Sequence, residues 1–243
     1  MSNYKNEILS NLTVVEDVDK EIKSLLLVDK AVTVGFLNQH AYNLISGDSC
    51  VKEDFFSLDY LFRDGKGVEL ACKFSGISSG LNLNGTDFIP AFIKAVIDSS
   101  VDFSLFTYGT TSPWLEAGSS ELFMGQAYMA LNGFQEKEDY LNNFKLNYRT
   151  GSFNVIVLAM GMPKQELVAR FLKNSINVPT IIICGGAIID FQAGRISRAP
   201  AFVRRLGFEW FFRLILEPKR LFKRYVVGIP VFFYSVIKDR NQH

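Results

Sequence analysis

Short runs of β-branched and other apolar residues alternate with glycine-containing turns and amphipathic segments along most of the chain. Such runs indicate buried strands of a parallel sheet, and the amphipathic segments between them indicate crossover helices. We therefore predict an α/β fold, a Rossmann-like parallel sheet with crossover helices. Strands are expected at residues 30–38, 58–63, 103–108, 154–160 and 180–184, and helices at 68–74, 87–99, 114–129 and 164–173, after one or two short helices within 3–27.

Three glycine turns follow predicted strands, at Gly109, Gly161 and Gly185-Gly186. Ligands of such sheets bind at the carboxyl ends of the strands. The helix that starts after each turn offers free N–H groups and a partial positive charge, which favour phosphate. Each turn alone fits ordinary chain reversal, but three at one edge favour a nucleotide site. The sequence contains neither GxGxxG nor a P-loop pattern.

The turn at Gly161 continues into Pro163-Lys164-Gln165-Glu166, where Pro is expected at the first helical position. In the simpler interpretation, Glu166 complements the helix dipole and Lys164 is solvated. In the alternative, Gln165 bonds a sugar hydroxyl or a phosphate of a ligand.

Asp64 follows a predicted strand, so a carboxylate is expected at the ligand edge of the sheet. There it could accept a proton as a general base, or simply stabilise a turn. Asp190, just beyond the Gly185-Gly186 turn, has the same two interpretations. His40 is the only internal histidine, and a core or capping role suits it better than catalysis.

Metal-binding patterns are weak. The single Asp-x-Asp pair, Asp17-Val18-Asp19, lies in a polar N-terminal segment with no strand before it. The three cysteines are scattered, and no His or Cys cluster has metal-ligand spacing. We therefore expect no metal and no cofactor, and arginines that neutralise a diphosphate instead.

The last 43 residues differ from the rest of the chain. Residues 201–243 carry a net charge of +6 and ten aromatic residues, whereas residues 1–200 carry −5. Interleaved basic and aromatic residues are typical of a segment at a membrane surface. We expect a catalytic domain at 1–197 and, at 198–243, a helical C-terminal appendage facing an anionic membrane. The apolar stretch 225–237, broken by Gly228 and Pro230, is shorter than the roughly 20 residues of a spanning helix.

The N-terminus lacks the apolar stretch of a secretory signal. We therefore expect a cytoplasmic protein that is peripheral at the inner face of the cell membrane. No nucleic-acid partner is expected, and a homo-oligomer is left open.

Taken together, the motifs resemble the WecG/TagA/CpsF glycosyltransferases over residues 32–237. The resemblance is carried by Asn38 with His40, Asp64-Gly65-x-Gly67, Gly85-x-Asp87, Ala159-Met160-Gly161-Met162-Pro163-Lys164-Gln165-Glu166, Gly185-Gly186 with Asp190-Phe191 and Gly194, Arg198-Ala199-Pro200, Glu209-Trp210-Phe211-Phe212-Arg213, and Glu217-Pro218-Lys219-Arg220 with Arg224-Tyr225.

The resemblance implies an inverting, metal-independent enzyme that moves a sugar from a UDP-sugar to an undecaprenyl-diphosphate-linked saccharide in surface polysaccharide synthesis. Asp64 is then the catalytic base, and Arg213, Arg220 and Arg224 fold over the site to neutralise the diphosphate. The residues expected to bind substrates are Asn38, His40, Gly85, Asp87, Gly109, Gly161, Pro163, Lys164, Gln165, Glu166, Gly185, Gly186 and Asp190.

Two positions depart from the family pattern. Phe36 stands where Thr is usual, and Asn82 where Arg is common. Both changes touch the expected substrate pocket, so the identities of the donor sugar and of the saccharide on the lipid stay open. The departures also favour an alternative, a catalytically silent nucleotide-sugar-binding or scaffolding subunit. A third hypothesis is a soluble nucleotide-dependent enzyme whose tail is an oligomer interface.

Overall fold

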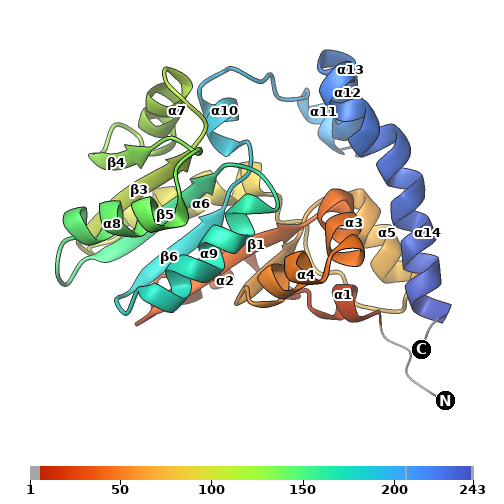
Figure 1. The fold of residues 1–243 in the computed structure, drawn as a ribbon, viewed down its shortest axis with the longest axis horizontal. Helices are drawn as coiled ribbons and strands as arrows, with labels where there is room; N and C mark the ends of the chain where they lie inside the picture. The colour runs from red at the N-terminus through yellow and green to blue at the C-terminus, as the bar shows by residue number, and fades with distance from the viewer. Residues whose placement is uncertain (1–5, 206, 242–243) are drawn as a thin grey trace.

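The computed structural model describes residues 6–205 and 207–241, so residues 3–5 of the first predicted helical segment lie outside the described residues. Six parallel strands form one open sheet in the order β2-β1-β6-β5-β3-β4, which confirms the predicted fold class (Figure 1). The strands are β1 (Ala31–Leu37), β2 (Tyr60–Arg63), β3 (Phe103–Gly109), β4 (Tyr128–Leu131), β5 (Phe153–Ala159) and β6 (Thr180–Cys184).

The two central strands of the sheet, β6 and β5, are the last two strands in the sequence. The chain pairs β1 with β2 on one side, crosses to β3 and β4 on the other, and then fills the middle with β5 and β6. Strands β1, β5 and β6 are buried along their whole length, as their continuous apolar runs predict. Their carboxyl ends therefore meet at the middle of one edge, where parallel sheets bind ligands.

Helices cover both faces of the sheet and bury two apolar cores. The helices that pack into the first core are α1 (Glu7–Ser10), α3 (Gln39–Gly47), α4 (Ser49–Phe56), α5 (Lys66–Phe74), α8 (Lys137–Asn147) and α9 (Lys164–Ser175). Those that pack into the second core are α2 (Val18–Leu25), α6 (Gly85–Asp98), α7 (Trp114–Leu122) and α10 (Ile188–Gln192).

Several element predictions need correction. The helix expected at 114–129 ends at Leu122, and residues 128–131 form the edge strand β4 instead. Met124 and Gly125 have φ angles of 52° and 74°, and left-handed backbone terminates a helix. Helices α3, α4 and α8 were not predicted; α3 and α4 start at the caps Asn38 and Asp48, and α8 starts at a capping box of Glu136 and Asp139. Asp17 is the N-cap of α2, where its side chain accepts from the amide of Lys20.

The C-terminal appendage is helical, as expected. It comprises α11 (Ala201–Arg205), α12 (Glu209–Leu216), α13 (Pro218–Phe222), the π-helical turn η1 (Lys223–Val227) and α14 (Gly228–Asn241). Helix α14 runs along α3, and Phe232 and Val236 from α14 are buried in the first core (Figure 1). The division of the chain at 197/198 stays a prediction. Within the described residues, no helix is both long and apolar enough to cross a membrane.

Candidate active site

A pocket of about 440 Å³ lies at the carboxyl edge of the sheet, below the appendage. It brings together segments that follow β1, β2, β5 and β6 with arginines from α12, α13 and η1. Most residues expected to act in the site line it. These are Asn38, His40, Asp64, Gly85, Gly161, Lys164, Gln165, Gly185, Gly186, Asp190, Arg213, Arg220 and Arg224.

Asn38 and Asp64 are adjacent because β1 and β2 end side by side. Leu37 is paired with Arg63 in the sheet, and the Asp64 amide donates to the Leu37 carbonyl. Asn38 Nδ2 then donates to Asp64 Oδ2 at 3.2 Å. Burial raises the pKa of Asp64, whereas the Asn38 hydrogen bond and the charges of Arg224, Arg213 and Arg63 oppose the rise. A carboxylate with a raised pKa is a better proton acceptor, as a general base requires.

All three glycine turns reach the pocket, the first through Thr110 and the others at Gly161 and Gly185-Gly186, but Gly109 itself does not line it. A Cβ on Gly109 would lie 2.2 Å from the carbonyl oxygen of Ala159. Gly109 is therefore needed for the close approach of β3 and β5.

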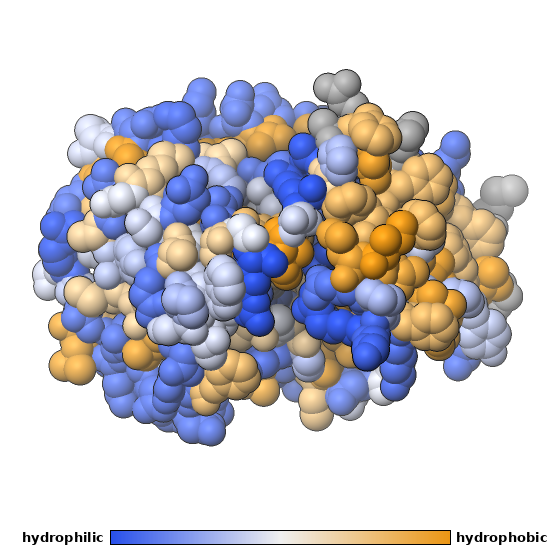
Figure 2. All heavy atoms as spheres, turned by 90° about the horizontal axis from the view of Figure 1, so that it is seen from above, coloured by the Kyte–Doolittle hydropathy of each residue, from blue (hydrophilic) through white to orange (hydrophobic). Residues whose placement is uncertain are grey.

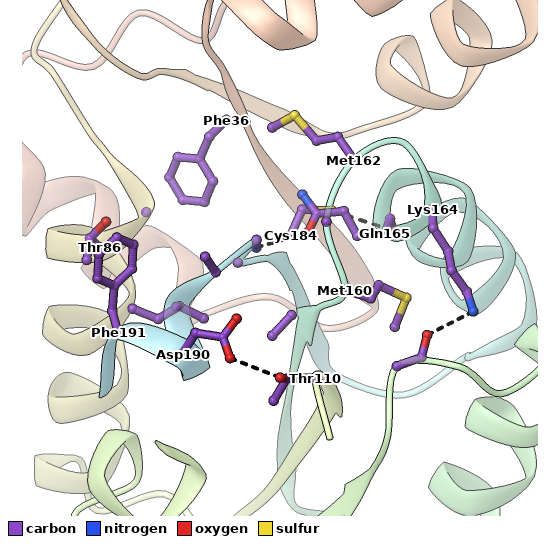
Figure 3. A pocket seen from close by; sticks show the side chains of 18 of the residues that line it. Phe36, Thr86, Thr110, Met160, Met162, Lys164, Gln165, Cys184, Asp190 and Phe191 are labelled. Atoms are coloured by element: carbon purple, nitrogen blue, oxygen red, sulfur yellow. Dashed lines mark hydrogen bonds between the residues drawn. The ribbon is translucent and has the colours of Figure 1, made fainter. Parts of the chain in front are cut away.

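The Lys164-Gln165-Glu166 segment departs from the simpler sequence interpretation, whereas ligand binding by Gln165 stays a prediction. Lys164 Nζ donates to the carbonyls of Gly133 and Gln135, at 2.9 and 3.0 Å, so this exposed side chain is bonded to the protein (Figure 3). Gln165 and Glu166 are fully buried although they are in the first turn of α9. Gln165 lines the pocket, whereas Glu166 and Pro163 do not, and Pro163 precedes the first helical residue.

Asp190 faces the pocket from α10 and is bonded across it to the end of β3. Its Oδ1 accepts from Thr110 Oγ1 at 2.9 Å and from Arg195 Nη1 at 3.1 Å (Figure 3). The neighbouring Phe191 ring lies 5.2 Å from the Arg213 guanidinium, a cation–π distance. The hydrogen bonds of Asp190 therefore hold α10, which carries Phe191, against the residue that follows β3.

Arg213 and Arg224 have buried Nε atoms without a hydrogen-bond partner, and neither forms an ion pair with the described residues. Arg220 pairs with Glu217 at 2.6 Å. Burial and the positive charges of Arg213 and Arg220 lower the pKa of Arg224. Cations without a counter-charge beside a polar pocket are suited to bind an anion with several oxygen atoms.

Asp87 and His40 differ in whether they line the pocket. Asp87 lies outside the pocket lining, where it accepts from Arg198 Nη2 at 2.5 Å and from Asn84 Nδ2 at 2.8 Å. It thereby ties α6 to the start of the appendage. His40 lines the pocket, and burial together with the charge of Arg224 lowers its pKa to about 4, so the imidazole is neutral at pH 7.

A second cavity of about 610 Å³ adjoins the pocket on the side of the appendage. Both cavities are lined by Asn38, Asp64, Thr86, Arg213 and Arg224. Aromatic residues of the appendage form much of the second cavity: Phe208, Trp210, Tyr225, Phe232 and Phe233. The Asp64 carboxylate therefore lies where two spaces meet.

Sequence reasoning missed several residues that line the pocket, namely Thr86, Thr110, Phe134, Met160, Met162 and Phe191. All but Phe134 lie within or beside a turn or motif that was recognised in the sequence. Their position next to these motifs could have indicated that they line the pocket. Among the described residues, no group of three or more His, Cys, Asp or Glu could hold a metal. Metal independence stays a prediction.

The parallel sheet, with a pocket at its carboxyl edge that holds Asp64, Arg213 and Arg224, places the protein in the Rossmann-like α/β class. A model of the family described as "Glycosyl transferase WecG/TagA/CpsF family" matches residues 6–243. The chain belongs to this family, and it is a glycosyltransferase.

Two similar proteins carry the name N-acetylglucosaminyldiphosphoundecaprenol N-acetyl-beta-D-mannosaminyltransferase. The protein of Bacillus subtilis (strain 168) is 24% identical over 190 residues, which span 76% of this chain and 71% of that protein. The protein of Staphylococcus aureus (strain NCTC 8325 / PS 47) is 27% identical over 191 residues, which span 75% of this chain and 70% of that protein.

Proposed function

We propose that the protein transfers a sugar from a UDP-sugar to an undecaprenyl-diphosphate-linked saccharide during synthesis of a surface polysaccharide or wall polymer. The names of the two relatives support this class of acceptor. One observation carries the proposal. The partly buried Asp64 shares a pocket with Arg213 and Arg224, which make no ion pair with the described residues.

The chemistry is a single displacement with inversion. Asp64 takes the proton of the acceptor hydroxyl, the hydroxyl oxygen bonds to the anomeric carbon, and the bond from that carbon to the UDP oxygen breaks. One carboxylate suffices, because no covalent intermediate is formed. Negative charge develops on the departing diphosphate, so preorganised positive groups beside it lower the barrier.

Arginines supply that charge in this proposal, and no metal ion is required. Arg213, Arg220 and Arg224 line the pocket that also contains the Gly161 and Gly185-Gly186 turns. Gln165 and these turns bind the UDP moiety on the sheet side. The planar guanidinium meets two oxygen atoms at once, which suits a diphosphate better than a point charge does.

The lipid-linked acceptor occupies the second cavity. Its aromatic walls suit an apolar chain, and Asp64 lies at its junction with the donor pocket. The appendage also exposes a large apolar surface, visible on the right of Figure 2. Large exposed residues there are Phe202, Phe208, Phe211, Ile215, Phe222 and Tyr234. A patch of this kind with exposed Lys219 and Lys223 fits an anionic membrane, which supports the proposal of a peripheral enzyme at the inner face of the cell membrane.

The test is a transfer assay with a panel of UDP-sugars and a short-chain undecaprenyl-diphosphate-sugar, with and without EDTA. The native enzyme is expected to release UDP and form the extended lipid in both conditions. Asp64→Asn should lose at least 100-fold in kcat. Asp48→Asn, a conservative change at an exposed helix cap, is the control. Loss of activity with EDTA that a divalent ion restores would refute metal independence.

A further inference from the structure

Glu166 is the most unusual charged group near the pocket. It is fully buried, its Oε2 has no hydrogen-bond partner among the described residues, and burial raises its pKa to about 7. The negative charge of Asp54 raises this pKa further, whereas a hydrogen bond from Gln165 opposes the rise. A buried carboxylate without a cation is costly, and proteins retain such groups mostly at functional sites.

A cation is available one helical turn away but does not pair with Glu166. Arg170, four residues on in α9, directs its Nη1 to Asp54 Oδ1 at 3.1 Å and to Glu53 Oε2 at 3.4 Å. Pairs spaced four residues apart on a helix commonly form ion pairs. Simple stabilisation of α9 by charge pairing therefore does not explain Glu166.

What Glu166 does contact is the side chain of its neighbour. Gln165 Nε2 donates to Glu166 Oε1 at 2.7 Å, and Gln165 Oε1 accepts from the amide of Gly186 at 2.9 Å. Adjacent residues of a helix do not normally face each other, so the Gln165 side chain is turned to meet both partners. Figure 3 shows the bond between Gln165 and the backbone that follows Cys184 at the pocket wall.

The two contacts fix which way the Gln165 amide points. An ionised carboxylate only accepts and a backbone N–H only donates, so Nε2 must face Glu166 and Oε1 must face Gly186. The second N–H of Nε2 makes no hydrogen bond to the described residues. With the amide fixed, this N–H is the group of Gln165 that remains for a ligand.

We propose that Glu166 is a positioning residue of the donor pocket. Its buried carboxylate fixes the orientation of the Gln165 amide, and so links the first turn of α9 to the Gly185-Gly186 turn, without itself touching the ligand. The inference rests on the proposed function only for the choice of UDP as the ligand.

The test is a double-mutant cycle on UDP binding, measured by calorimetry with Glu166→Gln, Gln165→Ala and the double variant. Glutamine at 166 has nearly the same shape but carries no negative charge, so its hydrogen bond from Gln165 Nε2 is weaker and holds the Gln165 amide less firmly. Each single variant should weaken binding about tenfold, and the double variant no further, because Glu166 acts through Gln165. Glu138→Gln, an exposed first-turn replacement in α8, should bind UDP like the native protein.

A purely structural role predicts the opposite pattern. Glu166→Gln would then change the melting temperature and leave UDP affinity unchanged, which would overturn the proposal. Additive losses in the double variant would also overturn it, because Glu166 would then contact UDP itself.

A second measurement needs no ligand and separates this inference from the proposed donor. The side-chain amide signal of Gln165 in a ¹H–¹⁵N spectrum, identified by its loss in Gln165→Ala, should shift as pH passes through about 7. It should not shift in Glu166→Gln. If the native protein fails to bind UDP but this titration is present, the donor assignment is wrong and the inference stands. An identical pH response in both proteins contradicts the inference.

Discussion

Asn38 Nδ2 donates a hydrogen bond to Asp64 Oδ2 at 3.2 Å, joining the residues that follow two adjacent strands. The same Asn38 side chain also caps α3, since its Oδ1 accepts from the amides of His40 and Ala41. One residue therefore sets both the start of a helix and the surroundings of the proposed base.

The dual role of Asn38 can be separated with Asn38→Ser. Serine caps helices as well as asparagine does, so stability should change by less than about 0.5 kcal/mol. Its shorter side chain no longer reaches Asp64, and the bond that lowers the pKa of Asp64 is lost. Because the base acts in its ionised form, the acid limb of the kcat/KM profile should move to higher pH. An unchanged profile would contradict the role of this hydrogen bond.

Arg224 should matter through its charge and its planar shape. Arg224→Ala removes a cation from both the leaving group and Asp64, so kcat should fall about 100-fold or more and the acid limb should shift upward. Arg224→Lys retains the charge but loses the bidentate contact, and should fall in between. Lys145→Ala, an exposed basic residue in the last turn of α8, is the control for steady-state kinetics. If kcat fell equally in Arg224→Ala and in the control alanine variant, a specific role of Arg224 would be contradicted.

Glu166 should reduce stability at neutral and higher pH. Its pKa is about 7 in the folded protein against an ordinary value of 4.5, so the unfolded chain releases the proton first as pH rises. Stability is then lost between about pH 4.5 and 7 and stays lost above that range. Glu166→Gln should therefore gain on the native protein by about 2 to 3 kcal/mol between pH 5 and 8. Chemical denaturation of both proteins at pH 5 and pH 8 measures this gain. The same stability difference between the two proteins at both pH values would contradict the raised pKa of Glu166.

The docking of α14 on α3 should depend on Tyr42. Its hydroxyl accepts from Asn6 Nδ2 at 2.5 Å and donates to Asp239 Oδ2 at 2.7 Å. Tyr42→Phe leaves two polar side chains without this partner and should cost about 1 to 3 kcal/mol. Proteolysis of the appendage should become faster. Tyr234→Phe, at an exposed position of α14, should be cleaved like the native protein, and equal cleavage rates for the two variants would rule out this role of Tyr42.

Local sequence patterns determined the architecture of the protein. Continuous apolar runs located five of the six strands, with the bounds of β6 correct at both ends, because a strand buried on both faces is almost continuously apolar. The glycine turns and Asp64 were correctly assigned to the carboxyl edge, since parallel strands bring these ends together. The family motifs were readable for the same reason, as they lie in contiguous segments.

Only the tertiary structure decided which side chains meet. Asp87 was expected to bind substrate but pairs with Arg198, and Gly109 packs on Ala159. Burial of Glu166 in the first turn of a helix could not be predicted, because residues near a helix start are usually exposed. It depends on α4, which is distant in the sequence. Sequence periodicity specifies which face of an element is apolar, but the partner of a polar side chain comes from another element, and only the fold supplies it.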